Sequence, residues 1–150
     1  MAYDSTVDAK KHIAAIQRLF NNVIIPELEK RKESHDESKF KSPERETYDK
    51  YIPMLKETKY GSDEYYEVRK KMEQEGLKHH YEVNRHHTVH FPDGINGMTL
   101  IDVVEMFCDW YAASLNSDTG FKSGLKNNKN KFHMSEQLYQ IFLNTYKEYF

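Results

Sequence analysis

Residues 99–115 predict a helix that is apolar on nearly every side. Thr99 can cap its first turn, and Asp102 can return a contact to the backbone of the cap. The apolar positions are Leu100, Ile101, Val103, Val104, Met106, Phe107, Trp110 and Tyr111. A helix that is apolar all round is covered by other parts of the protein, so this stretch predicts a buried central helix.

Three carboxylates interrupt this apolar helix at three- and four-residue spacing: Asp102, Glu105 and Asp109. A carboxylate on a buried helix is paired, protonated or bound to a cation, because burying an isolated charge costs on the order of several kcal/mol. Asp109 lies deep in the apolar run, between Cys108 and Trp110, and is therefore a candidate metal ligand. A buried salt bridge is the alternative explanation for Asp109.

Apolar residues recur at helical spacing in other parts of the chain as well. Ser5 or Thr6 can cap a first helix, and Pro26 should kink or restart it as a short segment over residues 26–32. Further helices are predicted for residues 43–58, for residues 62–83 after a break at Tyr60 and Gly61, and for the chain from about Ser135. Gly76 should allow close packing or a bend in the helix over residues 62–83.

Residues 116–131 are polar and contain Gly120 and Gly124, so they predict a long surface loop. Lysines make it locally basic; a solvated loop is the ordinary explanation, and a phosphate-binding loop is the alternative. Neither strand-like alternation nor an internal repeat is present in the sequence. The sequence therefore predicts an all-α protein, with residues 1–150 forming a single-domain bundle of about five to seven helices.

Composition sets limits on partners and location. The 22 Lys and Arg residues are outnumbered by 24 Asp and Glu residues, so there is no strong electrostatic case for nucleic acid. No apolar run approaches the roughly 20 residues that span a bilayer, and the N-terminus lacks the layout of a secretory signal. The single cysteine, Cys108, excludes an internal disulfide and a Cys-rich zinc site. We therefore expect a cytoplasmic protein without a membrane partner.

Histidine and aspartate are concentrated where they could bind metal. His35 and Asp36 form a doublet, and imidazole nitrogen and carboxylate oxygen are both good ligands for divalent first-row ions. Five of the eight histidines lie in one short segment: His79, His80, His86, His87 and His90. Because imidazole is the commonest protein ligand for such ions, the cluster predicts a metal site. If the preceding helix persists, His80, Asn84 and His87 share one side of it, and His79 points elsewhere.

His12 falls four residues before Ile16, on the edge of the predicted buried face of the first helix. Its ordinary explanation is a histidine at the edge of the core that is hydrogen-bonded to the backbone. Metal ligation by His12 is the alternative.

The order His12, then His35-Asp36, then Asp109 resembles the ordered pattern of the HD superfamily of metal-dependent phosphohydrolases. Lys39 is similar to the lysine that some HD families carry just after the doublet. The resemblance implies that His12, His35, Asp36 and Asp109 hold one divalent ion, whether Mn, Fe, Co, Zn or Mg. It also implies that Asp36 could bridge to a second ion, whose other ligands would be His80 and either His86 or His87.

A second resemblance covers most of the chain, roughly residues 12–114. It rests on His12, Arg31, His35-Asp36-Glu37-Ser38-Lys39-Phe40, Glu46, Asn84-Arg85-His86-His87, Glu105-Met106 and Asp109-Trp110. In these residues the chain is similar to an uncharacterised family of small phage and bacterial proteins with an HDxSKF motif. This family resemblance implies no particular chemistry.

The HD resemblance implies hydrolysis of a nucleotide or another small phosphate ester by water that a metal ion activates. Lys39 and Arg85 would steady the phosphate, and Glu105 would orient a ligand. Two alternatives remain: a di-iron oxygenase on an HD-type fold, and a non-catalytic phage or bacterial accessory protein in which the polar cluster only ties helices together. No glycine-rich phosphate loop and no Gly-x-Ser-x-Gly motif is present in the sequence.

Overall fold

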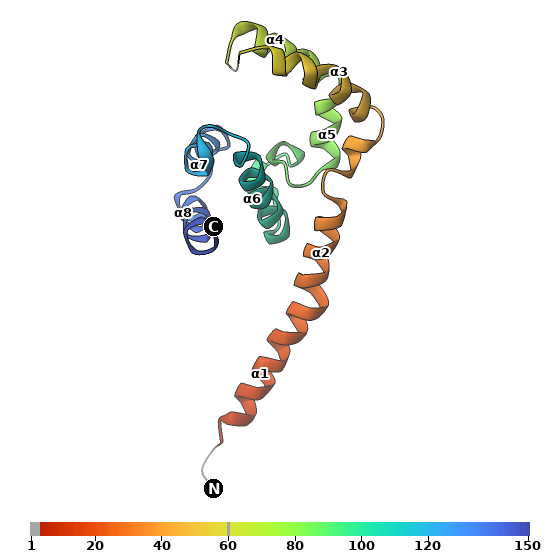
Figure 1. The fold of residues 1–150 in the computed structure, drawn as a ribbon. Helices are drawn as coiled ribbons and strands as arrows, with labels where there is room; N and C mark the ends of the chain where they lie inside the picture. The colour runs from red at the N-terminus through yellow and green to blue at the C-terminus, as the bar shows by residue number, and fades with distance from the viewer. Residues whose placement is uncertain (1–3, 60) are drawn as a thin grey trace. The chain divides into compact units, whose positions relative to one another are not determined.

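The computed structural model describes residues 4–59 and 61–150. It is all-helical, and the described residues contain no strand, so the predicted fold class is confirmed (Figure 1). The chain separates into two compact units, Met1–His35 and Asp36–Phe150, which are described here one at a time. The prediction of a single domain stays a prediction. Residues 1–3 and Tyr60, part of the predicted break, lie outside the described residues.

The first unit contains two α-helices joined by a π-helical turn. These are α1 (Thr6–Leu19), η1 (Phe20–Ile24) and α2 (Ile25–Ser34). Pro26 lies in the first turn of α2, directly after the π-helical turn, so a new α-helical segment begins at this proline as predicted, although the backbone stays helical from η1 into α2. The predicted cap is different, because Ser5 makes no side-chain cap hydrogen bond, and Asp4 Oδ1 instead accepts the Thr6 N–H at 3.0 Å.

The first half of the second unit is a helical hairpin with a short helix after it. Its elements are η2 (Glu37–Phe40), α3 (Glu44–Glu57), α4 (Asp63–Met72), the π turn η3 (Glu73–Leu77) and α5 (Lys78–Val83). Helices α3 and α4 lie side by side (Figure 1). They bury a small apolar cluster of Tyr51, Val68, Met72 and Leu77.

Gly76 lies in the π turn that divides the helix predicted for residues 62–83. A Cβ at this position would lie 2.4 Å from Thr47 Oγ1 of α3 and therefore inside van der Waals contact. Glycine thus permits the close packing of η3 on α3, which confirms the prediction for this residue.

The second half of the unit holds the larger core. After η4 (Thr88–His90) and η5 (Gly94–Gly97) come α6 (Leu100–Ser114), α7 (Gly120–Lys131) and α8 (Glu136–Tyr149). These helices bury Met106, Phe107, Phe121, Leu125, Met134 and Phe142. Helix α6 begins with the predicted capping box, in which Thr99 Oγ1 accepts the Asp102 N–H and the Asp102 carboxylate accepts the Thr99 N–H.

Two predictions about this half are wrong. Residues 120–131 form helix α7 rather than a surface loop, because Phe121 and Leu125, four residues apart, bury one side of it in the core. Gly120 has φ +70° at the start of α7, so it serves the turn into the helix instead of breaking it. Helix α6 is also less buried than predicted, since Leu100 is 70% exposed.

In the part of the chain that the structure describes, none of the helices combines the length and the apolar character that crossing a bilayer requires.

Candidate metal centre

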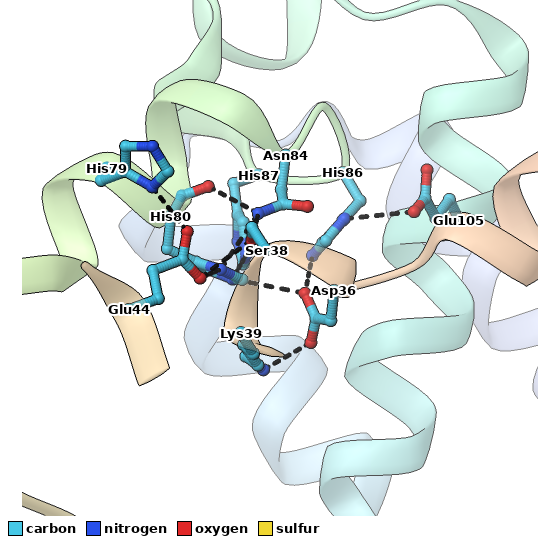
Figure 2. A network of polar contacts seen from close by, with 10 residues as sticks. All are labelled: Asp36, Ser38, Lys39, Glu44, His79, His80, Asn84, His86, His87 and Glu105. Atoms are coloured by element: carbon cyan, nitrogen blue, oxygen red, sulfur yellow. Dashed lines mark hydrogen bonds and ion pairs between the residues drawn. The ribbon is translucent and has the colours of Figure 1, made fainter. Parts of the chain in front are cut away.

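Asp36 stands at the middle of a polar cluster in the second unit (Figure 2). It precedes η2 and has a left-handed backbone, with φ 56° and ψ 17°, a conformation that aspartate tolerates better than most residues. Its Oδ1 atom lies 3.4 Å from His80 Nε2 and 3.4 Å from His86 Nε2. Its Oδ2 atom forms an ion pair with Lys39. One carboxylate oxygen therefore meets two imidazole nitrogens from different segments.

His80 is fixed in place by a buried carboxylate at the start of α3. The ring is buried on α5, and its Nδ1 atom donates to Glu44 Oε2 at 2.8 Å. Glu44, which is 0% exposed, also accepts hydrogen bonds from His79 Nδ1 and from Ser38 Oγ. Burial raises the pKa of the Glu44 carboxyl, but the hydrogen bonds from His79, Ser38 and His80 outweigh this and hold it below its usual value. With the His80 proton held on Nδ1, the Nε2 lone pair faces Asp36.

His86 repeats this arrangement on the other side of Asp36. Its Nδ1 atom lies 3.2 Å from Glu105 Oε1 of α6, and its side chain is 1% exposed. The Nε2 atom of the same ring faces Asp36 (Figure 2). A carboxylate that holds one ring nitrogen of a histidine and leaves the other directed at a common centre is the usual support of a metal-binding histidine.

His87 adds a third imidazole. Its Nε2 atom lies 2.8 Å from His80 Nε2. Burial, followed by the neighbouring His86 and His80, lowers the pKa of His87 to about 3. Burial also lowers the pKa of His80. Both rings are therefore neutral near pH 7, which is the form in which histidine binds a metal.

The donor atoms fit a divalent cation. Asp36, His80, His86 and His87 each offer one ligand atom, and these atoms all lie within 4.8 Å of one another. Asp36 and His86 also form a group of this kind with Asp109 of α6. Two nitrogens that bind one ion at about 2.0–2.1 Å lie roughly 3 Å apart when their bonds meet at a right angle, close to the His80–His87 separation. Imidazole nitrogen with carboxylate oxygen suits Zn, Fe, Mn or Co.

Two other predicted ligands belong to the first unit, and two further histidines of the segment 79–90 are not directed at Asp36. His12 lies in α1, and His35 ends the first unit directly before Asp36. Their part in the site stays a prediction, because the two units are described separately. His79 is bonded to Glu44 rather than directed at Asp36. His90 packs edge-on against the ring of Phe91.

The predicted phosphate-binding and orienting residues have different surroundings. Lys39 pairs with Asp36 at the centre of the cluster. Glu105 lies against His86. Arg85 makes a two-pronged pair with Asp102, from Nε to Oδ1 at 3.0 Å and from Nη2 to Oδ2 at 2.8 Å.

Sequence reasoning missed Glu44 and its neighbours. The sequence predicts only a helix over residues 43–58 here, and an acidic residue in a first turn such as Glu44 is ordinarily explained by the helix dipole. Asn84 was expected on the ligand-bearing side of a helix, but α5 ends at Val83 and Asn84 is extended. Its Nδ2 atom donates to Ser38 Oγ at 2.7 Å and so completes the network around Glu44. No local pattern marks Glu44 as a partner of histidine, because both of its imidazole partners come from α5, more than 30 residues away.

Comparison with known proteins gives one result that covers almost the whole chain. A family of unknown function (DUF5662) matches residues 1–148. No curated protein and no solved structure matches the chain. Because the match spans the first unit and nearly all of the second, the chain belongs to this family of unknown function, DUF5662.

Proposed function

We propose that the protein is a metal-dependent phosphohydrolase that acts on a nucleotide or another small phosphate ester. The observation that supports this most is the position of Asp36 Oδ1, which lies 3.4 Å from the Nε2 atoms of both His80 and His86. Each of these two imidazoles has its Nδ1 atom against a carboxylate, Glu44 or Glu105. Donors arranged in this way are prepared to hold a cation before it arrives.

The residues that would hold the metal are Asp36, His80, His86 and His87, with Asp109 available if a second ion binds. A bound divalent ion supplies two things in phosphate ester hydrolysis: it lowers the pKa of a coordinated water, and it offsets charge on the phosphoryl oxygens. The protein's own part is to orient these donors. Glu44 and Glu105 do so by keeping protons on the Nδ1 atoms of His80 and His86.

Lys39 supplies a further cation at the centre of the cluster. Its ammonium pairs with Asp36 and lies 5.3 Å from the centroid of the Tyr48 ring. The side chain is 36% exposed, so a phosphate oxygen can reach it from solvent and accept a charge-assisted hydrogen bond. Arg85 is left out of this role, because its Nε and Nη2 atoms bind Asp102.

The test is elemental analysis of the purified chain, followed by measurement of phosphate release from nucleotides and simple phosphomonoesters. We expect a stoichiometric divalent metal, and phosphate release that a chelator abolishes. Asp36→Ala should lose both the metal and the activity while keeping its helical circular dichroism. Asp49→Ala is the matched control, because Asp49 is a largely exposed aspartate on α3 that pairs only weakly with Arg45.

Three outcomes would replace the proposal. Metal-replete protein that releases no phosphate from any ester would remove the hydrolase assignment. Stoichiometric iron together with oxygen consumption would favour the di-iron oxygenase, which the nitrogen-rich donor set also suits. Metal-free protein whose melting temperature does not change in chelator would favour an accessory protein in which these residues only hold helices together.

A further inference from the structure

A cavity of about 270 Å³ borders the candidate metal centre. Its wall includes His86 and His87, so it opens directly onto two of the proposed ligands. Its volume falls just below the roughly 300–1,000 Å³ of pockets that take drug-sized ligands. The cavity therefore suits a small molecule or one part of a larger one.

The charged side chains around the cavity favour an anion. Arg69 of α4 and Lys131 at the end of α7 both line it, and among the described lining residues Glu73 is the one carboxylate. Arg69 is partly buried on α4, which restricts its motion. A guanidinium offers two parallel N–H groups to a phosphate, and an ammonium adds a point charge.

Thr88 and Val89 form a small part of the remaining wall, and three aromatic side chains form the rest. Trp110 of α6 and Phe132 are stacked, with ring centroids 5.7 Å apart and planes 19° from parallel. Tyr81 of α5 also lines the cavity and meets the His87 ring edge-on at 4.9 Å. Flat rigid rings of this kind gain contact area with another flat ring at little cost in side-chain entropy.

We infer that this cavity is the substrate pocket and that it takes a phosphomonoester whose alcohol part carries a flat aromatic ring. The inference rests on the proposed function, since it places the phosphate beside His86 and His87. Arg69 and Lys131 hold the phosphate oxygens, and the aromatic wall formed by Trp110, Phe132 and Tyr81 holds the ring. Recognition thus needs both parts of the ligand at once.

Trp110 is the single tryptophan of the chain and lines this cavity, so tryptophan emission reports ligand binding there. Trp110 also borders a second cavity along α7, and a change at Arg69, which lines only the first cavity, separates the two. The experiment titrates the full chain with adenosine 5′-monophosphate, with ribose 5-phosphate and with adenosine, while tryptophan emission is recorded. We expect saturable quenching by the monophosphate, with a dissociation constant at least about tenfold below that of either fragment, because each fragment lacks one of the two contacts. Equal affinity for ribose 5-phosphate and the monophosphate, or no saturable quenching by any of the three, overturns the inference.

Arg69→Gln tests the phosphate contact. It should weaken binding of adenosine 5′-monophosphate about tenfold or more and leave binding of adenosine unchanged. Arg45→Gln is the matched control, since Arg45 is an exposed arginine on α3 and does not line the cavity. A thermal melt of each variant shows whether it is folded. A folded Arg69→Gln variant that binds the monophosphate as tightly as the unchanged chain overturns the role of Arg69 and with it the cationic pocket.

The pocket and the proposed function fail in different ways. A chain that binds the monophosphate with the expected preference but releases no phosphate keeps the pocket and loses the hydrolase. A chain that holds metal and cleaves phosphomonoesters, but shows no preference for an aromatic ring, keeps the hydrolase and loses the pocket.

Discussion

Two buried carboxylates in the second unit, Glu44 and Asp102, are both 0% exposed and both lie in the first turn of a helix. Asp102 is neutralised by Arg85 and also caps α6 through Thr99. Glu44 is instead surrounded by a serine and two imidazoles. Arg85 and Asp102 satisfy each other's charge. The His80 ring, in contrast, binds Glu44 through one nitrogen and directs its second nitrogen at Asp36.

The difference shows how to separate structural from functional burial of charge. A buried carboxylate paired with a guanidinium is satisfied locally, and removing it mainly costs stability. A buried carboxylate paired with an imidazole also sets which nitrogen of the ring is available, and removing it alters what that ring can bind. Burial alone does not distinguish the two, but the identity of the partner does.

The largest loss of stability should come from replacing Asp102. Asp102→Ala leaves the Arg85 guanidinium, on a side chain that is 41% exposed, without its carboxylate partner and removes the Asp102 half of the capping box while Thr99 stays, so we expect a loss of about 2–4 kcal/mol in the free energy of unfolding. Urea denaturation followed by circular dichroism measures it. The folded fraction should keep its metal content. A variant that loses metal without losing stability would show instead that Asp102 supports the metal centre.

The next largest loss of stability should come from disturbing the packing of η3 against α3, the helix that carries Glu44. Gly76→Ala drives a Cβ into Thr47, whose helix carries Glu44, and such overpacking costs about 1–3 kcal/mol. Gly124→Ala is the matched control, because a Cβ there meets nothing within 4 Å. Thermal melts of the two variants should differ clearly. Equal melting temperatures would mean that α3 and η3 are not held in close contact.

Glu44→Gln tests the functional side of the comparison. The amide cannot accept from both imidazoles as a carboxylate does, so His80 loses its fixed orientation and metal affinity should fall 10–100-fold. Competition with a chelator of known affinity measures it, and the helical content should remain. An unchanged affinity would show that Glu44 serves stability alone, as Asp102 does.

The smallest effect should come from an exposed carboxylate. Glu75 accepts hydrogen bonds from Lys50 Nζ and Tyr51 Oη, and the Lys50 contact, followed by that from Tyr51, lowers its pKa. A lowered folded-state pKa means that the contribution to stability is present above the usual value of 4.5 and is lost as the pH falls through the folded-state pKa.

Glu75→Gln should therefore reduce stability less than Asp102→Ala or Gly76→Ala does, and its effect on stability should vanish in acid. Urea midpoints of the two chains at neutral pH and well below pH 4.5 provide the measurement. A difference that persists in acid would mean that the carboxylate charge is not the cause.

Much of the fold could be predicted from local patterns. The box of Thr99 and Asp102, the proline after η1 and the serine before α8 each mark a helix end through its own backbone chemistry, and each is where the sequence predicts it. Helix α7 could not be predicted in this way. Its only core anchors are Phe121 and Leu125, and the polar residues and glycines around them resemble a loop.

The candidate site was predictable in composition but not in geometry. Asp36, His80 and His86 were expected as ligands from residue type and order. The shared role of the neighbouring residues His86 and His87 depends on where α5 ends, since adjacent residues on a continuous helix would point about 100° apart. The chain leaves the helix after Val83, so the rings of His86 and His87 can both lie close to Asp36.

The π turn η3 sets the angular phase of the helix that follows it. A π turn contains one residue more than an α-helical turn, so it rotates everything downstream relative to α4. Deleting one residue from η3 would restore a regular helix and turn α5 by about 100°. His80 would then leave Glu44 and Asp36, although no ligand had been mutated. For this chain, the length of residues 73–77 is as much a part of the metal centre as the histidines themselves.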